Sequence, residues 1–290
     1  MSVDLHIHTS ASDGTTPPSK LIEEANQAGL SCISLTDHES IEGIIEIQGL
    51  AQAKNIKLIP GVELLAGYAD REIHLLGYYI DINSPILNNR LKELREERNA
   101  IAMDIVEKLR RHGFNINFER VQGIAQDNVA IGKNHILHAI YEAGYINSQD
   151  EMIEILRKYL TRNGLAYVEF TQHSFGEAVE LILQCDGIPV LAHPGLIRDD
   201  QIVLELLKYP VEGIEVYYYY FGNKRDEWIR RYEQLAQERK LLMTGGSDYH
   251  GQFAPVKLGE MHIPERVVTT LTEHWMARHQ QSTVKHNVAR

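Results

Sequence analysis

The chain has 290 residues, of which 43% are hydrophobic and 24% charged, the composition of a globular protein rather than a disordered one. Its formal net charge of −11 excludes a generally basic surface for long nucleic acid. A local positive site built from metal ions could still attract a small anionic substrate. No apolar stretch approaches the roughly 20 residues that cross a bilayer, so we expect no membrane segment.

The cysteines and the first residues of the chain bear on its cellular compartment. Cys32 and Cys185 stand in no paired motif, so we expect buried thiols in a reducing compartment. A first strand that starts at residue 3 leaves no room for the charged and apolar segments of a signal peptide. We therefore expect a cytoplasmic protein.

Two histidines mark the first predicted strand, in the segment "MSVDLHIHTS". The apolar residues Val3, Leu5 and Ile7 alternate with polar ones there, which is the period of a β-strand. Residues two apart on a strand point to the same face, so His6 and His8 project side by side. Two neutral imidazoles on one face make half of a metal site, whereas the alternative is a polar strand face with two surface histidines.

Strands and amphipathic helices alternate along the rest of the chain in two series. In the first series we expect helices at 17–30 and 41–55, and strands at 32–40, 57–68 and 72–81. In the second series we expect helices at 175–187, 199–208 and 223–239, and strands at 188–194, 211–220 and 241–250. Such alternation favours parallel pairing and right-handed crossovers.

The stretch between the two series is helical by period and carries little strand signal. It predicts a helical insertion at 88–170, which would cover the substrate, between barrel parts at 1–87 and 171–290. The charged run from Arg90 to Arg98 has mixed signs, and we interpret it as a solvated helix face.

Six of the 14 histidines and three carboxylates lie at or near the carboxyl ends of separate apolar runs. In an α/β barrel these ends converge on one face, where active sites are built. Mixed imidazole and carboxylate ligands suit Mn, Zn or Fe, and this number of ligands is enough for two or three divalent ions. The predicted metal ligands are His6, His8, Asp13, His38, Glu63, His74, His193, Asp248 and His250.

The motifs around these residues resemble those of the PHP (polymerase and histidinol phosphatase) family. They are "DLHIHTSASDG", "LTDHES", "PGVE", "EIHLLGY", "LAHPG" and "GGSDYHG", and they cover nearly the whole chain in the family's order. The chain is most similar to stand-alone phosphoesterases with a helical insertion, including nucleoside 3′,5′-bisphosphate phosphatases. The resemblance implies an α/β fold, a distorted seven-stranded (β/α) barrel with a trinuclear metal site.

The resemblance also implies a division of the ligands among the ions. One ion would be held by His6, His8, Glu63 and Asp248, a second by Asp13, His38 and His250, and a third by Glu63, His74 and His193. Glu63 would bridge, and we expect Glu63, Asp248 and His250 to carry catalysis. Clustered ions activate a bridging water and clamp phosphoryl oxygens, so no protein nucleophile is needed. Asp37 or Asp4 could orient a ligating histidine, although for Asp4 we favour a loop-capping role.

The insertion is expected to decide the substrate. Its segment "IGKNHILHAIYEAGY" resembles a family segment in which a basic residue and a histidine follow a glycine, commonly as "RPH". The matching residues are Lys133 and His135, and lysine lacks the bidentate fork of arginine. A helix start with ordinary polar residues is the alternative. Arg162 and Arg198 are further candidates for anion contact.

We therefore expect a metal-dependent phosphatase or phosphodiesterase for a small nucleotide-like metabolite, most simply a nucleoside 3′,5′-bisphosphate. The alternatives are an exonuclease on short RNA ends, so that a short oligonucleotide is the substrate, a histidinol phosphatase, a hydrolase of a carbon–nitrogen bond, and a non-catalytic metal-binding module. The tyrosines 217–220 could stack a nucleobase or pack at the rim. The oligomeric state stays open.

Overall fold

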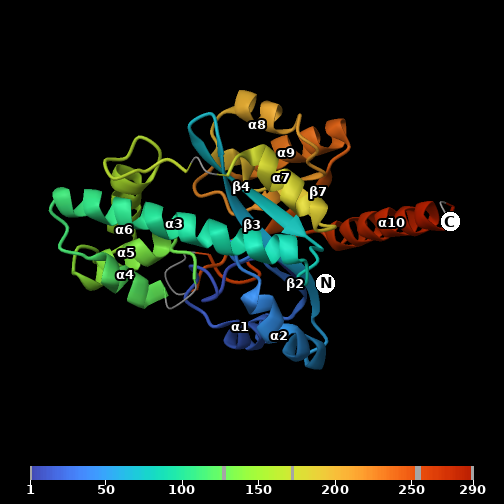
Figure 1. The fold of residues 1–290 in the computed structure, drawn as a ribbon, viewed down its shortest axis with the longest axis horizontal. Helices are drawn as coiled ribbons and strands as arrows, with labels where there is room; N and C mark the ends of the chain where they lie inside the picture. Colours follow the sequence, from blue (N-terminus) through green and yellow to red (C-terminus); the bar gives the residue numbers. More distant parts are fainter. Residues whose placement is uncertain (1, 126–128, 171–172, 252–255, 289–290) are drawn as a thin grey trace.

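The fold of this computed structural model is a nearly closed barrel of seven strands with helices around it (Figure 1). Residues 2–125, 129–170, 173–251 and 256–288 are described, with side chains up to residue 280. The strands follow one another around the barrel in chain order, and a parallel bridge between Ile7 and Tyr249 brings the two ends together. They are β1 (Ser2–Ile7), β2 (Leu30–Leu35), β3 (Lys57–Tyr68), β4 (Arg71–Tyr78), β5 (Ile188–Leu191), β6 (Gly213–Tyr218) and β7 (Leu242–Gly246). The predicted fold class is confirmed.

The parallel pairing that the alternation of strands and helices favours does not hold for one strand. Strands β1, β2 and β3 pair in parallel, as do β5, β6 and β7, whereas β4 is antiparallel to both β3 and β5. The cause is the connection between β3 and β4, which consists of Ala69 and Asp70 alone, both with positive φ (47° and 57°). Two residues of this conformation make a tight hairpin, and a hairpin can only join antiparallel strands.

Helices cover the outside of the barrel (Figure 1). Leu21, Ile22 and Ala25 show the common pattern, because their helical spacing gives one apolar face that is buried against the barrel. Sequence analysis made no prediction for the last helix, which projects away from the body of the molecule in Figure 1. These outer helices are α1 (Pro18–Gln27), α2 (Glu42–Ala53), α7 (Phe175–Gln184), α8 (Asp200–Leu206), α9 (Arg225–Arg239) and α10 (Arg266–Val288).

The connection from β4 to β5 is helical, as the sequence predicts. It contains α3 (Pro85–Arg111), α4 (Phe118–Ala125), α5 (Lys133–Glu142), α6 (Gln149–Ile155) and a π-helical turn at Leu156–Leu160. Its buried apolar side chains between Ala102 and Ala166 form a cluster of their own, whereas Leu87, Leu91 and Leu94 at the start of α3 belong to the cluster of the barrel. The division of the chain at residues 88 and 170 stays a prediction.

One interpretation of the charged run on α3 is wrong. Arg98 is not part of a solvated face, because only 7% of it is exposed and it pairs with the buried Glu39. Helix α3 has 27 residues and crosses in front of part of the barrel in Figure 1. Arg98 lies on the side of this helix that lines the cavity next to the barrel strands. Charge pattern alone does not reveal a buried ion pair.

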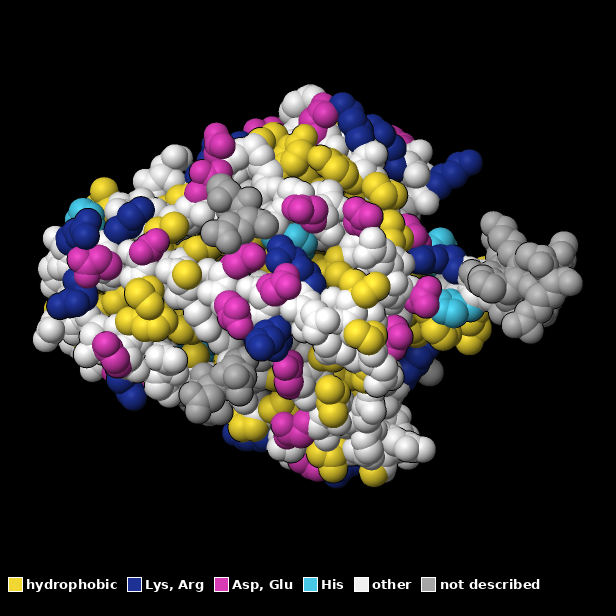
Figure 2. Space-filling model, viewed as in Figure 1, with side chains coloured by type: hydrophobic (Ala, Val, Ile, Leu, Met, Phe, Trp, Pro, Cys, Tyr) yellow, Lys and Arg dark blue, Asp and Glu magenta, His cyan; other side chains and the backbone are white. Residues whose placement is uncertain are grey.

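The distribution of charged side chains and the apolar character of the helices bear on the expectations drawn from the composition. On the face shown in Figure 2, basic side chains are scattered among acidic ones and do not form a continuous stripe. Within the described ranges, no helix combines the length and the apolar character needed to cross a bilayer.

Candidate metal centre

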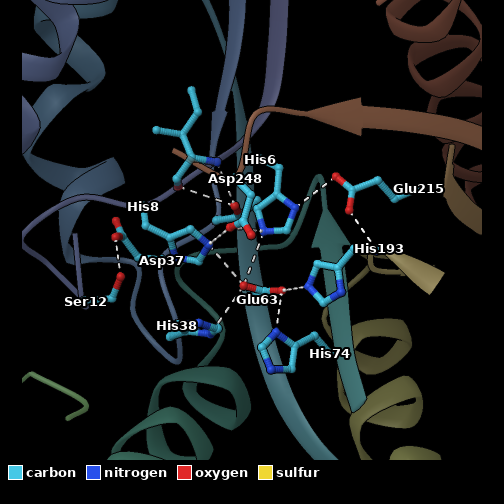
Figure 3. Close-up of polar contacts among 12 residues, drawn as sticks. His6, His8, Ser12, Asp37, His38, Glu63, His74, His193, Glu215 and Asp248 are labelled. Carbon is cyan, nitrogen blue, oxygen red and sulfur yellow. Dashed lines mark hydrogen bonds and ion pairs between the residues drawn. The ribbon is translucent and has the colours of Figure 1, made fainter. Parts of the chain in front are cut away.

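All nine predicted metal ligands lie around one point at the mouth of the barrel. Figure 3 labels all of them except Asp13 and His250. In each of three overlapping groups, every residue offers one ligand atom, and these atoms lie within 4.8 Å of one another. The groups are His6, His8, Glu63 and Asp248; His8, Asp13, His38 and His250; and His38, Glu63 and His74. The first group is the predicted first ion site, the second is the predicted second site with His8 added, and the third has His38 where His193 was expected.

Glu63 lies at the centre of the cluster, on β3, and only 1% of it is exposed. Its Oε2 atom is 3.3 Å from His6 Nε2, 3.1 Å from His8 Nε2 and 3.4 Å from His38 Nδ1. Its Oε1 atom is 2.9 Å from His74 Nδ1 and 3.2 Å from His193 Nε2. One carboxylate therefore faces five imidazoles, three on one oxygen and two on the other, as a carboxylate bridging between cations would.

Asp248 and His250 follow the last strand, β7, and belong to the same cluster. The Oδ1 atom of Asp248 lies 3.3 Å from His6 Nε2 and 3.2 Å from His8 Nε2. The ring of His250 donates from Nδ1 to the carbonyl oxygen of Asp248 at 2.9 Å. This leaves the Nε2 lone pair of His250 directed toward Asp13 Oδ1, 3.2 Å away, in the geometry that a shared cation needs.

The side chains fit metal ions because several of their buried polar atoms have no other use. Within the described part of the chain, His6 Nε2, both ring nitrogens of His8, Asp13 Oδ1 and His38 Nδ1 are buried without a hydrogen-bond partner. An unsatisfied buried polar atom costs about 1–3 kcal/mol, and folded proteins contain few of them. Five such atoms in one cluster, all imidazole nitrogens or carboxylate oxygens, are the donor set for divalent transition metals.

His8, His38 and His74 have pKa values that are shifted from the usual value of an imidazole. Burial lowers the pKa of His8, but the neighbouring carboxylates of Asp248 and Glu63 outweigh it and raise that pKa to about 10. Burial also opposes charge on His74, yet Glu63 and Glu72 raise its pKa to about 9. Burial lowers the pKa of His38 well below its usual value. A proton and a metal ion compete for the same lone pair, so metal binding should release protons.

Glu215, on β6, is a functional residue that the sequence analysis missed. It is fully buried, and its Oε1 accepts from His6 Nδ1 at 2.9 Å while its Oε2 accepts from the backbone amide of His193 at 2.8 Å. A proton held at Nδ1 leaves Nε2 of His6 as the metal-facing atom. The available signal was a single carboxylate between Ile214 and Val216 in an apolar strand.

Asp37 and Asp4, the candidates considered for that role, hold loops instead. Asp37 accepts from the amide and hydroxyl of Thr9 and from the hydroxyl of Ser12, which fixes the loop after β1. Asp4 accepts from the amide and hydroxyl of Ser247 and from the amide of Gly259. The loop-capping interpretation of Asp4 is therefore correct.

A cavity of about 1100 Å³ opens from the cluster toward the helical segment. Its walls include metal-cluster residues, the start of α5 and the loop after β5, and it is lined by all four predicted substrate-binding residues: Lys133, His135, Arg162 and Arg198. Arg162 and Arg198 are exposed, and among the described residues neither forms an ion pair. Their guanidinium groups are therefore available to an anion.

Lys133 and His135 have partners within the protein. Lys133 Nζ lies 2.5 Å from Glu72 Oε1, and the same carboxylate oxygen lies 3.2 Å from His74 Nε2. Burial lowers the pKa of His135 to about 4, and its Nδ1 accepts from the amide of Gly132. His135 is thus a neutral donor near pH 7, and Glu72, which the sequence analysis missed, links Lys133 to a predicted metal ligand.

The four consecutive tyrosines divide between two faces. Tyr217 donates to Glu233 and Tyr218 donates to Asp248 Oδ2 at 2.9 Å, while Tyr219 lies under the guanidinium of Arg225. Tyr220 accepts at its hydroxyl from the amide of Gly195. Tyr218 thereby orients Asp248, a contact that the strand alternation alone did not indicate.

The comparison with protein families matches residues 4–173 to the PHP domain. Among curated relatives, a phosphoribosyl 1,2-cyclic phosphate 1,2-diphosphodiesterase from Eggerthella lenta is 25% identical over 91% of this chain and 100% of its own length. The 5′-3′ exoribonuclease Rnm from Escherichia coli is 30% identical, over 88% of this chain and 87% of its own. A 3′,5′-nucleoside bisphosphate phosphatase from Chromobacterium violaceum is 28% identical, over 86% and 87% respectively.

Solved structures are similar over almost the whole fold. A protein from Bifidobacterium adolescentis, assigned as a metal-dependent phosphoesterase, is 26% identical with a TM-score of 0.82, covering 93% of this chain and 94% of that one. An amidohydrolase from Chromobacterium violaceum, solved with bound sulfate and no metal, is 26% identical with a TM-score of 0.81, covering 92% and 93%. The family match covers more than half of the chain, so this protein belongs to the PHP domain family and is a metal-dependent phosphoesterase.

Proposed function

We propose that this protein hydrolyses a phosphate ester of a small nucleotide-like metabolite, a nucleoside 3′,5′-bisphosphate, with two or three divalent ions of Mn, Zn or Fe. The observation that carries the proposal is Glu63, one buried carboxylate with five imidazoles around it at the base of a cavity. The cavity wall carries basic side chains at which a second phosphate can bind. The relative from Chromobacterium violaceum is named for this substrate class.

The predicted division of ligands is part of the proposal. His6, His8, Glu63 and Asp248 would hold one ion, Asp13, His38 and His250 a second, and Glu63, His74 and His193 a third. The grouping of ligand atoms supports the first two sites directly. For the third, support comes from His74 and His193, which both lie against the same oxygen of Glu63.

When bound, such ions lower the pKa of a water that they share and neutralise charge on phosphoryl oxygens. The protein's own side chains fix the geometry in which this occurs. Glu63 keeps the imidazoles at fixed positions, Glu215 sets the tautomer of His6, and Tyr218 holds Asp248. Preorganised ligands lower the barrier because little reorganisation is left for the reaction itself.

The second phosphate of the substrate would lie against the helical segment and the loop after β5. Arg162 and Arg198 supply charge there, His135 supplies a neutral donor, and Lys133 supplies a charge that it shares with Glu72. Contacts of this kind are remote from the reacting group and contribute by positioning it.

Hydrolysis of short RNA ends is the second candidate. A cavity of about 1100 Å³ exceeds the common range of about 300–1,000 Å³ for small-molecule sites and leaves room for more than one nucleotide. The relative from Escherichia coli is named as a 5′-3′ exoribonuclease.

The test is a screen of nucleoside 3′,5′-bisphosphates, nucleoside monophosphates, short oligonucleotides and histidinol phosphate with Mn present. The proposal expects the bisphosphates to have the largest kcat/KM, with release of one inorganic phosphate per molecule. Preferred cleavage of oligonucleotides would establish the second candidate. A set of amides is assayed in parallel. If the protein cleaved amides but no phosphate ester, its chemistry would be that of an amidohydrolase, the class for which the sulfate-bound structural relative is named.

A further inference from the structure

Two loops at the barrel mouth each place a large apolar side chain in the cavity wall. His193 stands just after β5, and three residues later Leu196 is 48% exposed. Tyr218 ends β6 and donates to Asp248, and three residues later Phe221 is 58% exposed. Both apolar side chains line the cavity that begins at the metal cluster.

These loops are fastened to each other. The amide of Gly195 donates to the hydroxyl of Tyr220 at 3.2 Å, and a Cβ atom at Gly195 would lie 2.6 Å from the Tyr220 ring. Leu196 and Phe221 are the residues that follow these two, so the hydrogen bond between the Gly195 amide and the Tyr220 hydroxyl ties the two loops together next to them. Both side chains are therefore exposed on loops whose arrangement is held by this contact.

A row of rings leads from the metal cluster along this wall. Ring centroids are 5.2 Å apart between His193 and Tyr218, 4.9 Å between Tyr218 and Tyr220, and 6.0 Å between Tyr220 and Trp228. Trp228, on α9, also lines the cavity. The inner rings are buried and hydrogen-bonded, so the surface left for a ligand is at the outer end of the row.

We propose that Leu196, Phe221 and Trp228 form a platform for the nucleobase of a substrate whose phosphate lies at the metal cluster. The inference rests on the proposed nucleotide substrate and assigns the site at which its base binds. Three residues of chain span at most about 11 Å, so Leu196 and Phe221 lie within one nucleotide's length of His193 and Tyr218. Aromatic and apolar faces accept any base, because every base has a π-face.

The platform differs from the stacking role considered for the four tyrosines. Their hydroxyls or rings are occupied by Glu233, Asp248, Arg225 and the Gly195 amide. Phe221 contacts Tyr219 edge-on at 5.2 Å and is still more than half exposed. A ligand that covered Phe221 would remove apolar surface from water without displacing a protein contact.

The sequence offers a direct probe, because it contains only two tryptophans. Trp275 stacks on Tyr79 at 4.9 Å, on α10 and away from the cavity lining. The variant Trp275→Phe therefore leaves Trp228 as the single tryptophan, which can be excited selectively at wavelengths where tyrosine does not absorb. Titration of this variant with a nucleoside 3′,5′-bisphosphate should quench the emission of Trp228, whereas base-free ribose 3,5-bisphosphate should leave it unchanged.

Substitutions on the same background test the two loop residues. Phe221→Ala and Leu196→Ala should each weaken binding of the nucleoside bisphosphate at least about fivefold, which corresponds to the lower end of base stacking. Affinity for ribose bisphosphate should stay the same. Ile45→Ala is the matched control, since Ile45 is 57% exposed on α2 and does not line the cavity.

Equal quenching by the two ligands, or an equal loss of affinity for both in Phe221→Ala, would overturn the platform. Failure of the proposed substrate has a different signature. In that case the nucleoside bisphosphate quenches Trp228 more than the base-free ligand does but is not hydrolysed with Mn present, and the platform stands.

Discussion

Arg98 on α3 places its Nη1 atom 2.5 Å from Oε2 of Glu39, and both side chains are buried. Glu39 follows the predicted metal ligand His38, and its other carboxylate oxygen accepts from the amide of Leu65 at 2.7 Å. Its carbonyl oxygen accepts from Arg95 at 2.7 Å. The helical segment and the loop that carries His38 are thus joined through one residue.

Removal of this pair should destabilise the protein strongly. Arg98→Met leaves the carboxylate of Glu39 buried without its cation, which typically costs about 3–5 kcal/mol. The free energy of unfolding, measured with urea, checks the loss. Arg110→Met on the same helix is the control, because Arg110 is exposed and its pair with Glu107 is at the surface. Equal effects of the two substitutions would contradict the role of the pair.

Glu215 should control metal affinity through His6. In Glu215→Gln the amide can donate to His6 Nδ1, which favours the wrong tautomer, so we expect metal affinity to fall about 10- to 100-fold. Metal titration followed by calorimetry measures this directly. Glu238→Gln, an exposed position on α9, should bind metal like the wild type. Unchanged affinity in Glu215→Gln would remove Glu215 from the site.

Lys133 and His135 should matter for a substrate with two phosphates and little for one with a single phosphate. Replacement of both by alanine should lower kcat/KM for a nucleoside bisphosphate at least about tenfold, the value of one charge-assisted contact. Hydrolysis of a simple aryl phosphate should change little. Salt should weaken the selectivity of the wild type more than that of the variant.

The control for this prediction is the comparison of kcat/KM for the nucleoside bisphosphate with kcat/KM for the aryl phosphate. Equal losses on both substrates would place Lys133 and His135 at the chemistry, for example through the contact of Lys133 with Glu72 and hence with His74. No loss on either would exclude both residues from substrate binding.

His173 should make stability depend on pH in the acid range. Burial, with Arg90 nearby, lowers the pKa of His173 to about 4, against 6.5 in the unfolded chain. The folded state therefore binds fewer protons between pH 6.5 and 4, and stability is lost as pH falls through that window. Across this window the lowered pKa of His173 changes the free energy of unfolding by about 3 kcal/mol.

Unfolding by urea at a series of pH values tests this dependence. His173→Leu should flatten the decline between pH 6.5 and 4 by about that amount, whereas His262→Gln, at an exposed position, should leave the curve unchanged. If the free energy of unfolding of His173→Leu and of the wild type declined equally with falling pH, His173 would not be the source of the decline.

The clustering of the predicted ligands could be foreseen because strand alternation and strand ends are local properties of sequence. His6 and His8 share a face by the period of the strand, and His193 and Asp248 follow apolar runs. The antiparallel position of β4 depends on the two left-handed residues Ala69 and Asp70, which are neither glycine nor a common turn pair.

The supporting residues could not be found in the same way. Glu215 binds His6 across 209 positions of sequence, and Arg98 binds Glu39 across 59. Such pairs arise from the closure of the barrel and from the position of α3 beside the cavity. A one-dimensional pattern shows that a charge is present but not that it is buried. The charged run of α3 was therefore interpreted as a solvated face, and the single acid in β6 gave no prediction.

The proposed function rests on one property, the dependence of catalysis on metal ions held around Glu63. Its most direct test is the rate of phosphate ester hydrolysis by protein freed of metal by chelation, measured before and after addition of Mn, Zn or Fe. We predict that the metal-free protein loses activity while keeping its fold by circular dichroism, and that at least one of these ions restores it. Full activity in protein shown by elemental analysis to be free of metal would contradict the claim.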